Sequence, residues 1–231
     1  MELRKIHRLA AVASLAALTG VVGACSSSQA PATGGQASAP ASESSAPSSE
    51  TTTPPNGGGV TKTTDIFGPA CDQVPKEGPG SPAGMVDAPV ATAASNNPLL
   101  TTLTKAVTAA NLGDTLNSAP ALTVFAPADP AFQALEAQHP GILKELTTAP
   151  DVASPNSKLA KILTYHVVGK RYDAAGIVQA GELDSLEGAK IKIGGTAAAP
   201  TVNGAPVLCG NIPTKNATVF VIGQVLSLPP S

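Results

Sequence analysis

The chain has 231 residues, of which 22 are glycine, 22 are proline and 3% are aromatic, and it contains no tryptophan. This composition is typical of one modest globular domain joined to unstructured sequence. The formal net charge of -2 argues against a nucleic-acid-binding protein and against a polybasic membrane-binding surface.

Residues 1–24 have the pattern of an export signal. Arg4, Lys5 and Arg8 form a basic start, and the apolar run LAAVASLAALTGVV follows over residues 9–22. That run is shorter than the roughly 20 residues that a membrane-spanning helix needs. We therefore expect a cleaved signal peptide and not a transmembrane helix.

The sequence Val22-Gly23-Ala24-Cys25 resembles the lipobox at which bacterial lipoprotein signals are cleaved. In that class of signal the cysteine is diacylglycerylated and becomes the new amino terminus, which is often acylated with palmitate or a similar chain. Two or three acyl chains give lasting attachment, whereas a single chain binds reversibly. We expect Cys25 to anchor the protein to the outer face of the bacterial cell membrane, with a shed form as a second destination. Ordinary secretion with an incidental cysteine is the alternative.

Residues 25–63 form a segment in which serine, proline and glycine dominate. Almost nothing in this segment can be buried, so we expect a disordered tether that holds a domain away from the envelope. Thr51, Thr52 and Thr53 resemble bacterial O-mannosylation substrates and are the candidate O-glycosylation residues. Asn216 begins the N-glycosylation triplet Asn-Ala-Thr, which we discount in a bacterial lipoprotein.

The remaining cysteines, Cys71 and Cys209, fall in residues 64–231, which we expect to form the single folded domain. An exported chain favours oxidation, and two thiols allow one pairing. A disulfide across this long loop would stabilise the domain by on the order of 4–5 kcal/mol. Two buried free thiols or a metal site are the alternatives, and the absence of a nearby histidine disfavours the metal. Residues 65–85, rich in proline and glycine, predict an irregular lead-in.

Helices are predicted first along the domain. Asn97 can cap a helix that Gly113 ends. An apolar strand is expected over residues 122–125. A second helix is expected to start at Asp129 by the same capping chemistry, and a third at Ser154.

Strands are predicted beyond residue 180. Six short apolar or alternating stretches carry this prediction: 183–186, 189–193, 201–202, 205–208, 218–222 and 224–228. Asn203-Gly204 is a strong two-residue hairpin signal between the third and fourth stretches. Helices followed by strands indicate an α+β domain with a largely antiparallel or mixed sheet.

Three stretches of the domain resemble conserved boxes of the fasciclin family. TVFAPADPAF (residues 123–132) resembles the first box, LTYHVV (163–168) the Tyr-His box and ATVFVIGQVLSLPP (217–230) the second box. Their order and spacing also fit, and the resemblance covers roughly residues 84–230. Within the family, the chain is most similar to mycobacterial surface lipoprotein antigens.

The resemblance implies a compact domain of helices packed on a twisted sheet, with a role in adhesion to cells or matrix. Animal members of the family are integrin ligands, partly through the region around the Tyr-His box, which Tyr165 and His166 match here. A host cell-surface or matrix protein is thus the implied partner, with an integrin-like receptor as an analogy. The chain has no Arg-Gly-Asp sequence, and a fold does not fix a function.

The candidate contact residues also have structural interpretations. For His166 we favour a buried imidazole, hydrogen-bonded to the backbone and locking a turn between helix and strand, over a base or binding contact. Lys170, Arg171 and Tyr172 place two cations beside an aromatic ring, which can meet an anionic glycan or a carboxylate. A solvated loop is the simpler interpretation of these three residues.

Catalytic motifs are absent from the sequence: it has neither a G-x-S-x-G elbow nor a G-x-x-x-x-G-K-[ST] phosphate loop. The closest acidic group, Glu182, Asp184 and Glu187, precedes Lys190 and Lys192 and indicates a solvated rim. We expect a monomeric domain that is not an enzyme and has no cofactor, metal site or nucleic-acid partner. The alternative function is a carrier of a lipid or an envelope glycan in a cleft between helices and sheet.

Overall fold

The computed structural model describes residues 59–229 of the chain. The predictions for the signal peptide, the lipid anchor, the tether and its modification lie outside the described residues: residues 1–24, Cys25, and Thr51, Thr52 and Thr53. Within residues 59–229, no helix is long and apolar enough to cross a membrane. The same residues contain no group of three or more His, Cys, Asp or Glu side chains arranged to hold a metal ion.

Seven strands of the described chain form one sheet in the order β2-β1-β7-β6-β5-β4-β3. They are β1 (Leu122–Pro127), β2 (Val167–Val168), β3 (Glu182–Asp184), β4 (Lys190–Thr196), β5 (Ala199–Val202), β6 (Ala205–Pro213) and β7 (Ala217–Ile222). All neighbours run antiparallel except β1 and β7, which are parallel. The mixed sheet and its helices confirm the predicted α+β class.

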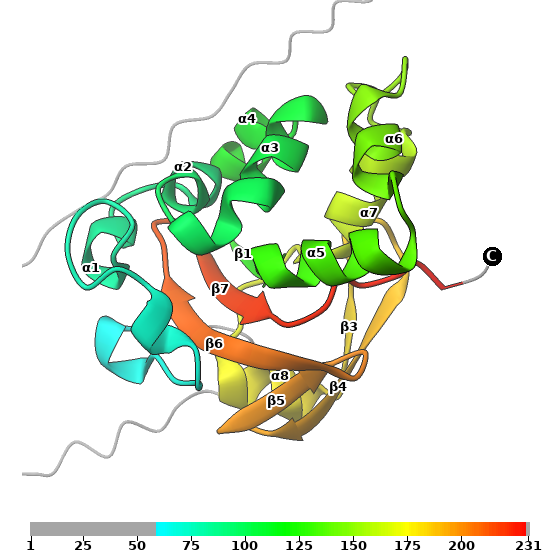
Figure 1. Cartoon of the computed structure of the whole chain (residues 1–231). Coiled ribbons are helices and arrows are strands. Elements are labelled where there is room, and N and C mark those ends of the chain that lie inside the picture. The colour runs from blue at the N-terminus through cyan, green and yellow to red at the C-terminus, as the bar shows by residue number, and fades with distance from the viewer. Residues whose placement is uncertain (1–58, 230–231) are drawn as a thin grey trace, which may run out of the picture. The chain divides into compact units, whose positions relative to one another are not determined.

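Short helices surround this sheet. The α-helices are α1 (Pro82–Met85), α2 (Val90–Ser95), α3 (Thr101–Ala109), α4 (Gly113–Ser118), α5 (Asp129–Gln138), α6 (Ile142–Thr148), α7 (Lys158–Tyr165) and α8 (Ala174–Ala180). Three 3-10 turns are η1 (Thr63–Asp65), η2 (Cys71–Gln73) and η3 (Pro98–Leu100). Helices α2 to α7 lie on one side of β1 and β7, and α8 lies on the other side, against β3 and β4 (Figure 1).

The central strands β1 and β7 are buried along their whole length and separate two hydrophobic cores. The helical core includes Leu103, Phe132, Leu146, Leu159 and Leu163, and the sheet core includes Phe125, Tyr165, Ile177, Ile191 and Phe220. Because successive side chains of a strand point to opposite faces, Val124 and Val219 join the helical core while Phe125 and Phe220 join the sheet core. The rings of Phe125 and Phe220 lie 5.8 Å apart between centroids.

A disulfide joins Cys71 in the lead-in to Cys209 in β6. Next to it, the backbone of Phe67 pairs with that of Gly210, with N–H to O distances of 3.3 and 2.8 Å. The predicted pairing is therefore confirmed, and the alternatives of free thiols and a metal site are excluded for these two cysteines. The chain-entropy model assigns such a long loop on the order of 4–5 kcal/mol of stabilisation.

The first predicted helix is correct at its start and wrong at its end. The Asn97 side chain accepts a hydrogen bond from the backbone N of Leu99 at 3.0 Å and caps the turn that leads into α3. Helix α3 ends at Ala109, and Asn111 adopts a left-handed φ of 54°. Asparagine tolerates this conformation, so the chain turns before Gly113, which begins α4 instead.

The caps predicted for the next two helices are also corrected. Asp129 lies inside the first turn of α5, and its carboxylate accepts hydrogen bonds from Thr101 Oγ1 (2.6 Å) and Thr102 N (2.8 Å). Asp129 therefore caps α3 and not its own helix. Helix α7 starts later than predicted, because Ser157 and not Ser154 accepts the capping hydrogen bond from Ala160 N, at 3.0 Å.

In the strand region, the Asn203-Gly204 hairpin is confirmed. Val202 pairs with Ala205, and Asn203 and Gly204 have φ values of 49° and 83°. Strand β4 runs through its glycine pair to Thr196, because β5 pairs with it there. The predicted last strand, 224–228, is wrong: this segment belongs to no strand of the described sheet.

Candidate functional site

The Tyr-His segment forms the junction between α7 and β2. His166 is 3% exposed, and its Nδ1–H donates to the backbone O of Ile162 at 2.7 Å. Its Nε2 accepts a hydrogen bond from the backbone N of Leu226 at 2.9 Å. Burial lowers the pKa of His166 to about 4, so the imidazole is neutral at neutral pH. Both nitrogens are engaged, which matches the structural interpretation favoured for this residue.

Tyr165 faces the sheet core from the end of α7. Its side chain is 2% exposed, and its hydroxyl donates to the backbone O of Lys190 at 3.0 Å and accepts from Asn203 Nδ2 at 2.7 Å. The hydroxyl therefore ties α7 to the β4 and β5 region of the sheet. Neither Tyr165 nor His166 presents a surface that a partner protein could touch directly.

Of the predicted cluster at 170–172, only Lys170 is exposed. The guanidinium of Arg171 donates to the backbone oxygens of Thr214 and Ala217, each at 2.8 Å, and burial lowers the pKa of Arg171. Tyr172 is half-buried and packs against the sheet core. Arg171 thus joins the loop after β2 to the turn between β6 and β7, and it is not a free cation on the surface.

The predicted acidic rim lies at the sheet edge formed by β3 and β4. Lys190 Nζ lies 2.7 Å from Asp184 Oδ1 and 3.6 Å from Glu182 Oε1, and all three side chains are exposed. The hydrogen bond to Asp184 raises the pKa of Lys190. This exposed ion-pair cluster agrees with the solvated rim that the sequence indicates.

Asn216, the first residue of the glycosylation triplet, is buried and fully engaged. Its Oδ1 accepts from the backbone N of Val90, and its Nδ2 donates to the backbone oxygens of Leu116 and Ala119. A glycan at this position would remove the hydrogen bonds that join the turn before β7 to α2 and α4. The burial of Asn216 agrees with our discounting of this triplet.

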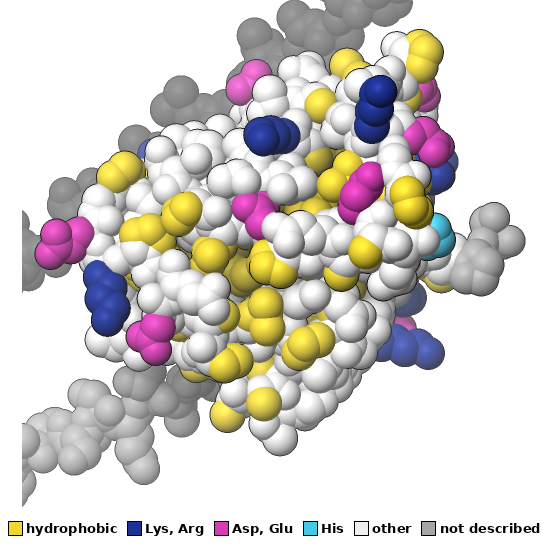
Figure 2. Space-filling view, viewed as in Figure 1, with side chains coloured by type: hydrophobic (Ala, Val, Ile, Leu, Met, Phe, Trp, Pro, Cys, Tyr) yellow, Lys and Arg dark blue, Asp and Glu magenta, His cyan; other side chains and the backbone are white. Residues whose placement is uncertain are grey.

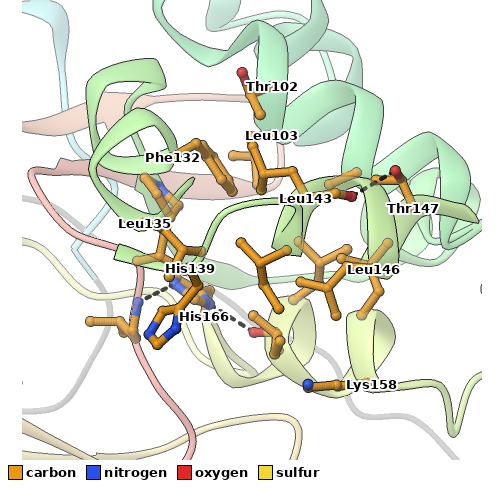
Figure 3. A pocket seen from close by; sticks show the side chains of 18 of the residues that line it. Thr102, Leu103, Phe132, Leu135, His139, Leu143, Leu146, Thr147, Lys158 and His166 are labelled. Atoms are coloured by element: carbon orange, nitrogen blue, oxygen red, sulfur yellow. Dashed lines mark hydrogen bonds between the residues drawn. The ribbon is translucent and has the colours of Figure 1, made fainter. Parts of the chain in front are cut away.

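A cavity of about 700 Å³ lies on the helical side of the domain, bounded by α3, α5, α6, α7 and residues 225–228. Figure 2 shows hydrophobic side chains at the floor of a hollow in this part of the surface, with charged side chains around it. The walls are mainly leucine, with one phenylalanine: Figure 3 labels Leu103, Phe132, Leu135, Leu143 and Leu146.

Two of the polar side chains that line this cavity, His166 and Thr147, are already hydrogen-bonded. Figure 3 shows His166 bonded to neighbouring backbone groups, and Thr147 Oγ1 donates to the backbone O of Leu143 at 2.7 Å. Lys105, Lys144 and Lys158 contribute to the lining from three different helices and are exposed. The site is therefore an apolar space with cations at its margin.

A smaller cavity, of about 250 Å³, lies between α2, α3, α4 and the start of β2. It shares Leu103, Leu163 and His166 with the larger one. Both cavities therefore border the same buried histidine, His166.

The Fasciclin domain family model matches residues 98–229. The chain belongs to the fasciclin family. The resemblance carried by the three boxes is thereby confirmed, and the boxes coincide with β1 and the start of α5, with the α7–β2 junction, and with β7 and the segment after it.

The relatives of this fasciclin-domain protein include mycobacterial and cyanobacterial proteins. It is 41% identical over 175 residues to "Immunogenic protein MPB70" of Mycobacterium bovis, covering 72% of this chain and 84% of that protein. It is 40% identical over 175 residues to "Cell surface glycolipoprotein MPB83" of Mycobacterium bovis, covering 72% and 74%. A cyanobacterial relative, "Protein sll1483" of Synechocystis, is 39% identical over 137 residues, covering 59% and 71%.

Among solved structures, the fold is similar to the FAS1 domain pair of the insect cell adhesion molecule Fasciclin I. The TM-score is 0.54 at 21% sequence identity, and the match covers 63% of this chain and 52% of that chain. The chain thus spans about half of that two-domain structure. At this identity the likeness concerns the fold alone.

Proposed function

We propose that this protein is a monomeric, lipid-anchored lipoprotein of the bacterial cell surface, whose fasciclin domain binds host cell-surface or matrix proteins without catalysis. The observation that carries the proposal is the lipobox cysteine, Cys25, ahead of a tether and a fasciclin domain. A relative that shares 40% identity is named a cell-surface glycolipoprotein, which supports the same position for this chain. O-linked sugars on Thr51, Thr52 or Thr53 belong to the same proposal.

The loop after β2 is the best-supported contact surface. The buried Thr123 donates through Oγ1 to the backbone O of Lys170 at 2.8 Å and accepts from the backbone N of Tyr172 at 2.9 Å. Arg171 adds the bonds to the turn before β7. The loop is therefore held in one conformation before any partner arrives, which lowers the entropy cost of binding.

An exposed apolar side chain lies beside this loop. Leu186 is 48% exposed, and its Cδ2 would lie 3.2 Å from a Cβ at Gly169, so it packs directly over the residue before Lys170. Lys170 and Leu186 together offer a partner one positive charge and one exposed apolar side chain beside a loop of fixed conformation. In this proposal Tyr165, His166 and Arg171 act by positioning the loop and not by touching the partner. An integrin-like receptor is one candidate partner, by family analogy.

Binding to host cells and matrix proteins tests the contact. A soluble form, residues 26–231, should bind saturably, and Lys170→Ala with Leu186→Ser should weaken binding about tenfold or more, as expected for a small interface hot spot. The melting temperature should change little, because both side chains are exposed. Val86→Ser, at an exposed apolar residue elsewhere in the domain (37% exposed), is the control. Non-saturable binding, or equal binding by the double variant and the control, would contradict the proposal.

Mass analysis of protein extracted from the bacterial membrane tests the anchor. The amino-terminal peptide should begin at Cys25 and carry acyl chains on its thiol. A free thiol at Cys25 would end the lipoprotein part of the proposal and leave the protein contact to be judged by the binding experiment.

A further inference from the structure

The large cavity has the size of a ligand site and lies apart from the proposed contact surface. Its volume of about 700 Å³ falls within the roughly 300–1,000 Å³ that small-molecule sites occupy. Lys170 and Leu186 do not contribute to its lining. A function of the cavity is therefore independent of the proposed protein contact.

The interior of the cavity suits a hydrocarbon chain and not a sugar. Leu135 and Leu143 are half-buried and face the space from α5 and α6 (Figure 3). The imidazole of His166 already donates to Ile162 and accepts from Leu226, so it has no hydrogen bond left for a ligand. A glycan brought into this space would lose its bonds to water without replacement, whereas an acyl chain would gain from burial.

The charges in the lining indicate the head group. Lys105 on α3, Lys144 on α6 and Lys158 on α7 contribute to the lining, and no aspartate or glutamate does. Three carboxylates lie nearby. Asp129 accepts hydrogen bonds from Thr101 and from the backbone N of the lining residue Thr102. Glu145 is 3.9 Å from Lys158 in an exposed pair, and Glu136 accepts hydrogen bonds from the first turn of α6. Exposed pairs are weak, so the lysines remain available to an anion.

We propose that this cavity binds one free long-chain carboxylate, such as a fatty acid, with its chain among the leucines of α5, α6 and α7 and its carboxylate at the lysines of the rim. The apolar lining favours a hydrocarbon chain in the ligand. The three lysines favour a negatively charged head group, because the lining itself contains no carboxylate. The protein is then both a surface protein and a carrier of an acidic amphiphile, and either property can exist without the other.

Titration calorimetry on residues 26–231, stripped of bound lipid, tests whether the cavity binds the hydrocarbon chain of a carboxylate. Saturated carboxylates of 8, 10, 12 and 14 carbons, each below its micelle concentration, should bind with one site per protein. Affinity should rise about fourfold per buried methylene until the cavity is full. Absence of saturable binding, or affinity that does not depend on chain length, would overturn the proposal.

The head group is tested by comparison with the matching alcohol and by substitution at the rim. Dodecanol should bind more weakly than dodecanoate, and Lys144→Gln and Lys105→Gln should each weaken dodecanoate about two- to fivefold, with less effect on dodecanol. Equal affinity for alcohol and carboxylate would overturn the charge assignment. Binding to phosphatidylglycerol vesicles without binding of free carboxylate would indicate a membrane surface and would also overturn the proposal.

The location is tested by placing a charge in the cavity. Leu143→Glu should reduce dodecanoate affinity by more than tenfold, because a carboxylate in an apolar site repels both chain and head group. Val86→Glu, the same change at an exposed residue outside both cavities, is the matched control and should bind like the unmodified protein. Normal binding by a folded Leu143→Glu variant would overturn the location.

Should that variant fail to fold, the exposed Lys105→Gln and Lys144→Gln variants test the location of the site: unchanged dodecanoate affinity in both overturns the location. Concentration-dependent dimers that exclude the ligand would assign the cavity to a second copy of the chain.

Discussion

Strands β1 and β7 separate two cores that are filled to different degrees. The sheet core brings Phe125 and Phe220 together with Tyr165 at the end of α7 and with helix α8. The helical core is built from several short helices with leucine and alanine between them, and most of the lining of both cavities belongs to that side. Both cavities lie between short helices, whereas the rings of Phe125 and Phe220 pack against each other in the sheet core. We infer that the sheet core carries much of the stability and the helical core carries the site.

The largest expected difference between the two cores is in the cost of removing a side chain. Phe220→Ala, at a fully buried position of the sheet core, should lower the free energy of unfolding by about 3–5 kcal/mol. Leu143→Ala, at the wall of the cavity, should cost less than about 1 kcal/mol, because the side chain is half-buried and alanine favours the helix. Urea denaturation measures both. Similar costs for the two variants would contradict the contrast between a filled and an open core.

A second prediction concerns His166, which faces the helical-side cavities while its neighbour Tyr165 packs in the sheet core. The unfolded chain binds a proton at this histidine near pH 6.5, but the folded protein does so only near its pKa of about 4. Stability should therefore fall as pH drops from 6.5 to 4, with about 3 kcal/mol lost through this group.

Denaturation at several pH values for the unmodified protein and for His166→Gln isolates the effect. The variant should lack this part of the decline. His139→Gln, at an exposed histidine that ends α5, is the control and should keep it. An unchanged decline in His166→Gln would refute the assignment.

The smallest effect is expected from one hydroxyl of the sheet core. Tyr165→Phe keeps the ring but leaves Asn203 Nδ2 and the backbone O of Lys190 without their partner, which should cost about 1–2 kcal/mol. Tyr172→Phe, at a half-buried ring, should change stability by about 0.5 kcal/mol or less. Equal effects in thermal denaturation would mean that the Tyr165 hydroxyl does not link α7 to the sheet.

The sequence was most informative where a conformation depends on a few adjacent residues. The Asn203-Gly204 turn and the Asn97 cap were predicted correctly, because each needs only its own backbone and the next residues. The caps at Asp129 and Ser154 were predicted by the same rule and were wrong. The Asp129 carboxylate has Thr101 within reach, on a helix that lies 28 residues earlier in the chain, and no local pattern contains that information.

The candidate contact residues show the same limit. Tyr165, His166 and Arg171 have side chains that suit binding, and the sequence by itself left binding and structural roles open. Their bonds reach residues 25, 60 and 43 positions away at Lys190, Leu226 and Thr214. Exposure is a property of the folded chain, so only these distant partners decided that the three side chains hold the fold together.

The sequence by itself determined the fasciclin family through its three boxes and the α+β class through the order of its elements. It favoured a disulfide between Cys71 and Cys209, because two cysteines allow only one pairing. It could not determine the cavity. Phe132, Leu135 and Leu163 have the spacing of ordinary core residues, and whether such side chains meet or leave a space depends on how α3, α5, α6 and α7 pack. That packing is a tertiary property, and it turned a predicted core face into a site lined by leucines and bordered by lysines.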